Sequence, residues 1–245
     1  MSTSTPKAPS ATRIAVVIVC RNACAALAAT LDSLRALADP RLLTIVIDGA
    51  SSDATPELLL ARRDQLFHTV SESDRGIYDA MNKGWQASPA DAYVLYLGAG
   101  DHLVELPEAA ALHDECGEPW PVVMGDCMVG TYIFRSRWSR ELRLRNTAHH
   151  QALMIHKSVH PAPPFDTSLR VYADWEFNLR LMHRGVTAHH VPQLRAYAEP
   201  GGISSGHHNL DEIRSVASRH GGPLVGLASW ALNRASLWRR RHAER

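Results

Sequence analysis

Charged side chains follow several apolar stretches in the first half of this sequence. Asp48 comes directly after the apolar run Leu42 to Ile47, and Asp101 comes shortly after the run Ala92 to Leu97. Arg75 follows a third, shorter apolar segment. Carboxylates in such places can hydrogen-bond a nucleotide, or hold Mg²⁺ or Mn²⁺ against its diphosphate, because these cations prefer hard oxygen ligands.

The elements that would position these residues alternate along the chain. The run Ile14 to Cys20 is continuously apolar and β-branched, which is typical of a strand buried on both faces of a parallel sheet. The same reasoning predicts further strands over 42–47, 67–70 and 92–97, and helices over 23–38, from Thr55 as N-cap, and over 77–87. Ligands of such sheets bind outside the carboxyl ends of the strands. We therefore expect Asp48, Arg75 and Asp101 to converge there.

The second half lacks this alternation. It offers a helix over Pro107 to Cys116 and strands over 122–124 and 132–134. We expect an α/β fold whose mainly parallel central sheet carries helices on both faces. A smaller mixed sheet should form an acceptor-side lobe.

Composition excludes some functions. The chain has 26 basic and 25 acidic residues, a net charge of +1, which gives no field that would gather nucleic acid. The four cysteines lack the spacing of a zinc site and predict buried thiols in a reducing cytoplasm. Residues 1–12 are polar, with no apolar core of a secretion signal, and predict a disordered extension of a cytoplasmic protein.

Several segments, in chain order, resemble the successive motifs of family 2 glycosyltransferases. They are Ile14 to Asn22, Ile47 to Thr55, Asp74 to Gly84 and Leu95 to Asp101. Two more, His149 to Ala152 and Tyr172 to Arg180, are similar to segments of bacterial members that build polysaccharides and glycolipids. The resemblance implies a GT-A fold over residues 13–205 and transfer of a sugar, with inversion, from a nucleotide-sugar to a glycan or lipid-linked acceptor.

The resemblance also implies roles for the donor-side residues. Asp48 would hydrogen-bond the nucleobase, and Arg75 would lie against the base or the diphosphate. Asp101 resembles the last acid of the metal-binding Asp-X-Asp element, although Ala99 stands where its first acid would be. One carboxylate, phosphate oxygens and waters can still complete a magnesium site. For Asp48 the alternative is a turn residue.

On the acceptor side, Asp174 is expected to be the general base, since inverting transfer needs a carboxylate to take the proton of the attacking hydroxyl. The alternative for Asp174 is an N-cap of a helix over Trp175 to Arg184. By the same resemblance His150 and Gln151 would line the acceptor or donor-sugar side, and a structural histidine is the alternative. Gly201 to Ser205 would be a loop that closes over the donor.

Other functions remain open at this stage. A Rossmann dehydrogenase is disfavoured, because Arg21 to Cys24 replace the glycine fingerprint after the first strand. A non-catalytic GT-A binding module and a sugar-nucleotide nucleotidyltransferase are the alternatives. Asp101 and Asp174 together argue against the first, and the lack of a glycine-rich basic loop after the first strand argues against the second.

The C-terminal tail, residues 206–245, is predicted to be helical and basic. Leu224 to Trp238 combines Leu, Trp and Ala, and three arginines follow. This stretch is too short and too interrupted to span a bilayer, but it suits an interfacial helix at the inner face of the cell membrane. The alternative is a helix that packs on the domain.

Overall fold

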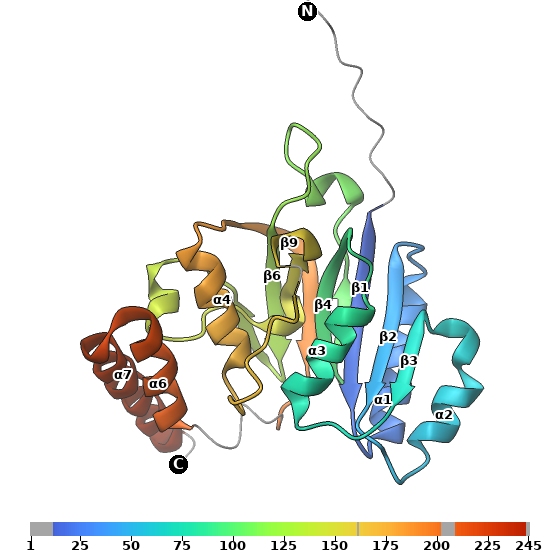
Figure 1. Ribbon diagram of the computed structural model, residues 1–245, viewed down its shortest axis with the longest axis horizontal. Helices are drawn as coiled ribbons and strands as arrows, with labels where there is room; N and C mark the ends of the chain where they lie inside the picture. Colours follow the sequence, from blue (N-terminus) through green and yellow to red (C-terminus); the bar gives the residue numbers. More distant parts are fainter. Residues whose placement is uncertain (1–11, 161, 202–208, 244–245) are drawn as a thin grey trace, which may run out of the picture.

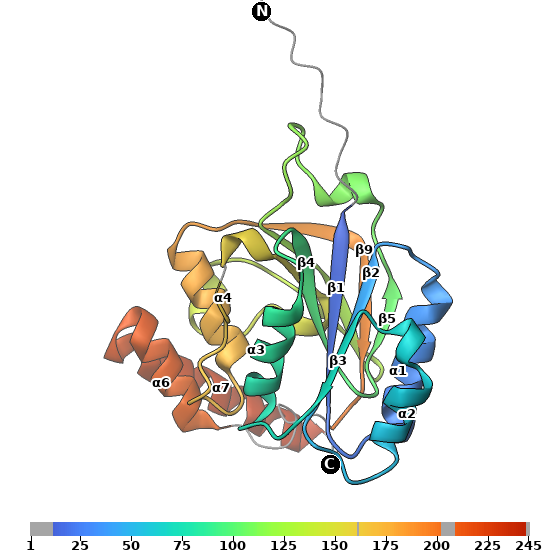
Figure 2. The same cartoon turned by 45° about the vertical axis from the view of Figure 1, so that its right-hand side comes forward.

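The computed structural model describes residues 12–160, 162–201 and 209–243 of the chain, and Figure 1 shows their arrangement. Within these residues the strands form one nine-stranded sheet in the order β3-β2-β1-β4-β8-β6-β9-β5, with β7 also paired to β6. Helices cover both faces of the sheet (Figures 1 and 2). The predicted α/β class is thus confirmed.

The first half of the chain builds the parallel part of the sheet, as expected. Its strands are β1 (Arg13–Cys20), β2 (Leu42–Asp48), β3 (His68–Ser71) and β4 (Ala92–Gly98). They run parallel with β1 between β2 and β4. The helices between them are α1 (Cys24–Leu37), α2 (Thr55–Ala61) and α3 (Ile77–Ala87).

The second half adds mixed strands to the same sheet. These are β5 (His102–Glu105), β6 (Val122–Val129), β7 (Tyr132–Arg135), β8 (Leu153–His156) and β9 (Ala188–Ala198). Strand β8 runs antiparallel to both β4 and β6, and β9 runs parallel to β6 and antiparallel to β5. The mixed strands therefore form the mixed part that we expected, and β8 joins them to the parallel part in one sheet because it pairs with both β4 and β6.

Alternate side chains of the strands face two different cores. In β1, Val17 and its same-face neighbours pack with α3, α4 (Ala173–His183) and α6 (Leu210–Gly221). Residues Ile14, Val16 and Ile18 pack on the other face with α1 and α2. Both faces are buried, which explains the continuous apolar run of β1.

Close approach of backbones fixes two places in the fold. A Cβ atom on Gly84 would collide with the Val17 side chain, so α3 can lie this close to β1 only with glycine there. A Cβ atom on Gly125 would collide with the carbonyl of Leu194. Gly125 lies where the register of β6 and β9 shifts, so this glycine permits the bulge.

Two expectations, those for 107–116 and for the cysteines, were wrong in detail. The helix predicted over Pro107 to Cys116 is a single 3-10 turn, η2 (Ala109–Leu112), because the Asp114 carboxylate accepts the N–H groups of Cys116 and Glu118 and closes a turn. The tail forms two helices, α6 and α7 (Pro223–Ala243). Cys116 is exposed, although all four cysteines are free thiols.

The remaining short elements are 3-10 helices. They are η1 (Arg63–Gln65), η3 (Arg140–Arg143), η4 (His150–Ala152) and η5 (Lys157–Val159). Residues 1–11, which hold nearly all of the predicted N-terminal extension, lie outside the described residues, as do 202–205 of the predicted closing loop. The division into extension, domain and tail stays a prediction.

Candidate active site

The loops after β1 and β2 are bound together at the carboxyl ends of the parallel strands. Asn22 has a φ of 50°, in the left-handed region that Asn tolerates better than most residues. Its Oδ1 atom accepts the N–H of Ser52 at 2.8 Å, and its own N–H donates to the Oγ of Ser51 at 2.7 Å. Asp53 accepts the N–H groups of Cys24 and Thr55. These hydrogen bonds therefore join the two loops to each other.

Thr55 was predicted as an N-cap, and this detail is wrong. The helix begins at Thr55 itself, and the Asp53 carboxylate accepts its N–H at 3.0 Å. The Thr55 hydroxyl instead accepts the N–H of Ala23 at 3.3 Å. Asp53 thus accepts the first N–H of the helix, and the Thr55 hydroxyl links this loop to the loop after β1.

Asp48 lies at the end of β2 with 0% of its surface exposed. Its carboxylate accepts the N–H of Ser51 at 3.1 Å and the hydroxyls of Ser51 and Ser71. These contacts join the ends of β2 and β3, which is the turn role that we held as the alternative. The contact of Asp48 with a nucleobase stays a prediction.

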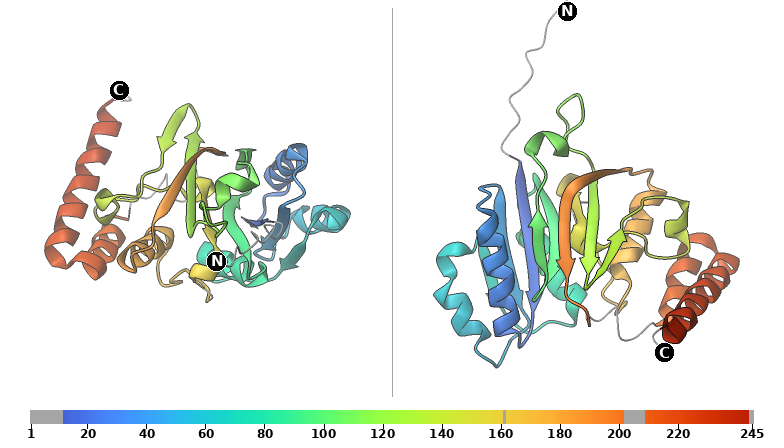
Figure 3. Two further views of the ribbon diagram at one scale, coloured as in Figure 1. Left: turned by 90° about the horizontal axis from the view of Figure 1, so that it is seen from above. Right: turned by 180° about the vertical axis from the view of Figure 1, so that it is seen from behind.

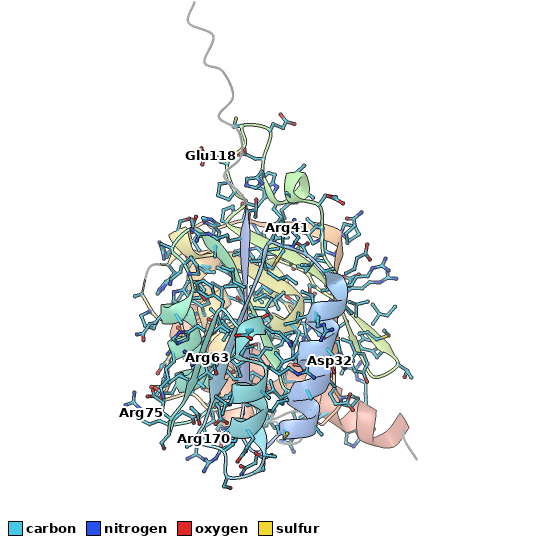
Figure 4. All side chains as sticks on the ribbon, turned by 90° about the vertical axis from the view of Figure 1, so that its right-hand side faces the viewer. Asp32, Arg41, Arg63, Arg75, Glu118 and Arg170 are labelled. Atoms are coloured by element: carbon cyan, nitrogen blue, oxygen red, sulfur yellow. The ribbon has the colours of Figure 1, made fainter. Side chains whose placement is uncertain are left out.

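Arg75 lies at the surface before α3, and its side chain is 80% exposed. Its guanidinium contacts the Asp79 carboxylate at 3.2 Å. Figure 4 shows Arg75 at the lower end of the molecule, the end where β1, β2 and β4 finish in Figure 1. The long, exposed side chain is placed to reach a ligand at this edge of the sheet.

Asp101 is 6% exposed and lies just after β4. Its Oδ2 atom accepts the N–H of Gly98 at 2.7 Å and the Nε2 amide of Gln151 at 2.9 Å. Its Oδ1 atom accepts the N–H of Glu199 at 3.0 Å, just beyond β9. Three distant parts of the chain thus hold this carboxylate in one orientation.

Asp174 is 8% exposed and is the second residue of α4. Its Oδ2 atom accepts the Nδ2 amide of Asn146 at 3.1 Å and lies 3.4 Å from the Nδ1 atom of His150. Its Oδ1 atom lies 3.3 Å from the hydroxyl of Tyr78. Asp174 is not the residue before the helix, so the predicted N-cap role is wrong in detail. Its position in the first turn still suits a negative charge.

The pKa of Asp174 is lowered from its usual value. Burial acts in the opposite direction, but the hydrogen bond and charge of His150, the N–H of Trp175 and the charge of His149 together outweigh it. A lowered pKa keeps the carboxylate ionised at neutral pH, which is the state that a proton acceptor needs.

The short helix η4 connects the two acids. His150 contacts Asp174, and the next residue, Gln151, donates to Asp101. The neighbouring His149 is half-buried, and desolvation of its ring lowers its pKa to about 4 although the charges of Asp174 and Asp101 act in the opposite direction. The predicted site residues His150 and Gln151 are therefore brought together with Asp101 and Asp174, on the side of β4 that faces the second half of the chain.

The carboxylate oxygens of Asp101 can be compared with the ligands that a divalent cation needs. Among the described residues, no group of three or more His, Cys, Asp or Glu side chains could hold a metal ion. A carboxylate has about four lone-pair sites, and three of those of Asp101 accept N–H groups. The site fits a cation with one protein oxygen and phosphate and water ligands, as Mg²⁺ often has.

Several residues of the site were not predicted from the sequence. Tyr78 and Asn146 contact Asp174, and Tyr78 also donates to the carbonyl of Val171 at 2.6 Å. Glu212, in α6, accepts the N–H groups of Arg170, Val171 and Tyr172, which lie just before α4. Tyr78 falls inside the third of the motifs quoted above, so its position could have been noticed. Glu212 lies in the tail and gave no such signal.

Comparison with known proteins is informative at the level of the family. Residues 15–175 match the family model "Glycosyl transferase family 2". The chain is 31% identical over 205 residues to a "PGL/p-HBAD biosynthesis glycosyltransferase" of Mycobacterium bovis and to one of Mycobacterium tuberculosis. In both cases the match covers 78% of this chain and 78% of the relative.

Solved structures of glycosyltransferases share the fold. S. aureus TarS 1-349 in complex with UDP-GlcNAc superimposes with a TM-score of 0.66 at 17% identity, over 84% of this chain and 65% of that one, just under two thirds of its length. The mannosyltransferase PcManGT from Pyrobaculum calidifontis, in complex with GDP-Man and Mn²⁺, gives a TM-score of 0.61 at 18% identity, over 91% of this chain and 72% of that one. The chain has the GT-A fold of these nucleotide-sugar transferases, and it belongs to glycosyltransferase family 2.

Proposed function

We propose that this chain transfers one sugar, with inversion, from a nucleoside-diphosphate sugar to a hydroxyl of a glycan or lipid-linked acceptor, with Asp174 as the general base. The observation that carries the proposal is the placement of His150 and Gln151. These consecutive residues hold two buried acids that are 73 positions apart in the chain, Asp101 and Asp174. Asp101 suits a cation that would bind the leaving diphosphate, and Asp174 suits removal of the proton from the acceptor hydroxyl.

The proposed step is a single displacement at the anomeric carbon. The acceptor oxygen forms the new bond to that carbon while its proton passes to the Asp174 carboxylate. The bond from the anomeric carbon to the diphosphate oxygen breaks, and its electron pair leaves with the nucleoside diphosphate. Attack opposite the leaving group inverts the configuration at the anomeric carbon. The lowered pKa of Asp174 supports this role, because the base must be ionised before the step begins.

Asp101 is proposed as the protein ligand of Mg²⁺ or Mn²⁺. A divalent cation there would supply positive charge to the departing diphosphate. The hydrogen bonds from Gly98, Gln151 and Glu199 hold the carboxylate in place. Arg75 and Asp48 are proposed to contact the donor nucleotide, Arg75 by charge and Asp48 at the base.

Other glycosyltransferases with this fold support the substrate class. TarS was solved with UDP-GlcNAc, PcManGT with GDP-Man and Mn²⁺, and GalNAc-T7 with UDP, GalNAc and Mn²⁺. We therefore propose a nucleoside-diphosphate sugar as the donor and a divalent cation as the cofactor.

Membership of the glycosyltransferase family disfavours the nucleotidyltransferase alternative. A non-catalytic binding module would not need a buried carboxylate that His150, His149 and the N–H of Trp175 keep ionised, so the surroundings of Asp174 also argue against that alternative.

Thermal unfolding with nucleotides tests the donor site. A ligand at a hundredfold excess over its Kd stabilises the folded state by about 2.7 kcal/mol, or roughly 5 to 10 °C in a chain of this size. UDP or GDP should give such a shift with Mg²⁺ or Mn²⁺ and a smaller one with chelator. Asp101→Asn should abolish the difference, whereas Asp32→Asn, on the outer surface of α1, should retain it. Equal shifts with cation and with chelator for every nucleotide would exclude a cation at Asp101.

A further inference from the structure

Helix α7 contacts the rest of the protein through Val225 and through polar and small residues. The hydroxyl of Ser229 and the Nδ2 amide of Asn233 both donate to the carbonyl of Leu144, at 2.6 and 3.1 Å. A Cβ atom on Gly226 would collide with the hydroxyl of Ser218 in α6, so the two helices lie very close together. The inward face of α7 is therefore already occupied.

The opposite face of α7 is apolar and exposed. Leu224, Leu227 and Trp238 are 80%, 52% and 62% exposed. With the exposed alanines between them they form one surface, here called the α7 outer face: Leu224, Leu227, Ala228, Ala231, Ala235 and Trp238. At 100° per residue these positions fall within an arc of about 100°. Leu232, at 37% exposure, lies on α7 beside this surface, whereas other large exposed apolar side chains, such as Leu60 and Phe67, lie outside α7.

The charge of α7 has one sign. The sequence from Pro223 to Ala243 contains no acidic residue, and it contains Arg234, Arg239, Arg240 and Arg241. Arg234 lies over the ring of Trp230, 5.0 Å from its centroid. The arginine-rich end of the helix lies at the lower end of the molecule, level with the end of β1 but to one side of it (Figure 1).

We propose that the α7 outer face docks on an anionic lipid surface. An apolar stripe bordered by arginines, with a tryptophan near the basic end, matches a bilayer interface that is apolar below and negatively charged above. From Leu224 to Trp238 the stripe extends about 21 Å, at a rise of 1.5 Å per residue, parallel to that interface. Among the described residues no helix is long and apolar enough to cross a membrane. A second copy of this chain is a poorer match, because its α7 outer face would offer no acidic residue to the arginines.

Docking in this way would orient the proposed catalytic lobe. Helix α6, which packs on α7, carries Glu212, and its carboxylate holds the backbone of 170–172 directly before Asp174. Figure 3, in the view from behind, shows α6 and α7 as a pair at one side of the sheet, with their lower ends level with the carboxyl ends of the parallel strands. The lipid surface would therefore lie beside the acceptor side of the site. This inference goes beyond the proposed function, because lipid binding needs no transfer.

Vesicle sedimentation with the full chain tests the proposal. The chain should bind vesicles of phosphatidylcholine with phosphatidylglycerol, and binding should weaken as salt rises or when phosphatidylglycerol is omitted. The double variant Leu224→Gln, Leu227→Gln should weaken vesicle binding roughly tenfold or more. Replacing Arg239 with glutamine should weaken it about fivefold. The control variant Leu60→Gln, Phe67→Gln removes two equally exposed apolar side chains elsewhere and should bind as the wild type does.

Three outcomes would overturn the proposal. They are no binding of the wild type to anionic vesicles, equal binding by the α7 double variant and the wild type, and equal loss in the control variant. A wild-type dimer in sedimentation equilibrium that the α7 double variant converts to a monomer, with vesicle binding unchanged, would instead assign the face to a second copy. Circular dichroism and thermal unfolding of each variant establish that a loss of binding is not a loss of fold.

Discussion

Replacing Asp174 with asparagine separates a proton acceptor from a structural acid. The asparagine oxygen can take the place of Oδ2 and accept from Asn146 and His150, at the present 3.1 and 3.4 Å. Its amide nitrogen would then face the hydroxyl oxygen of Tyr78 at 3.3 Å and donate to it. The Tyr78 hydroxyl continues to donate to the carbonyl of Val171. Every polar group around residue 174 thus retains a partner.

The expected magnitudes differ greatly between folding and catalysis. Two hydrogen bonds to a charged acceptor become neutral, at a cost of about 1 kcal/mol each, and removal of a buried charge offsets part of this. We therefore expect stability to fall by less than about 2 kcal/mol, which is under roughly 8 °C in Tm. An amide cannot accept the acceptor's proton, so kcat for transfer should fall about 10²- to 10⁴-fold. Affinity for UDP with a cation should change little.

Glu176→Gln is the matched control, because Glu176 is a second buried acid in the first turn of the same helix. Its oxygens accept from Arg180 and His220. This variant should lose stability without losing transfer by more than a few fold. Both variants are assayed for Tm, for UDP binding and for product formation with the best donor and acceptor. Near wild-type transfer by Asp174→Asn would refute the assignment of the base, and so would equal losses of activity in the two variants.

Three further predictions concern stability and positioning. Glu212→Gln should lower Tm and reduce kcat with KM for the donor unchanged, because one amide oxygen would replace a carboxylate that accepts three N–H groups just before Asp174. Steady-state kinetics tests this prediction, and an altered KM for the donor would contradict it. Desolvation lowers the pKa of His149 to about 4 from an unfolded value near 6.5, so the unfolded chain binds this proton more readily. Neutral His149 therefore contributes about 3 kcal/mol to the free energy of unfolding above pH 6.5, and this contribution is lost as the pH falls toward 4. Urea unfolding of wild type and His149→Gln should therefore diverge in that window, and parallel pH profiles would contradict it. Gly84→Ala should destabilise the fold by about 1 to 3 kcal/mol, because its new methyl group would meet Val17, and an unchanged Tm would show that α3 can move away from β1.

The parallel half of the fold could be predicted almost element by element. Continuous β-branched runs such as 14–20 leave few alternatives to a buried strand, and the observed β1 spans Arg13–Cys20. The segment 107–116 was misjudged because its alanines favour a helix locally. In the structure the Tyr93 hydroxyl donates to the carbonyls of Leu112 and Trp120, which holds the chain in an open path. A tertiary contact of this kind leaves no trace in local propensity.

The sequence predicted which residues form the candidate site, but not which of them contact each other. Motif resemblance supplied Asp101, Asp174, His150 and Gln151, and all four lie together. That Gln151 holds Asp101 could not be derived, because 50 residues separate them and the contact depends on β8 pairing beside β4. Nor could the sequence indicate that Asp48 is fully buried, since a strand-end acid can point toward solvent or toward its own loop.

The geometry of η4 explains why a histidine and a glutamine stand next to each other. In a 3-10 helix successive side chains point about 120° apart, so two consecutive residues can reach two different partners. His150 turns toward α4 and Gln151 turns toward the end of β4. Both acids then depend on one short segment, which β8 anchors between β4 and β6 in the middle of the sheet. A shift of this segment by one residue would place either His150 beside Asp101 or Gln151 beside Asp174, and the present pairing would be lost. The spacing between the proposed leaving-group side and the proposed base is therefore set by the register of a single central strand.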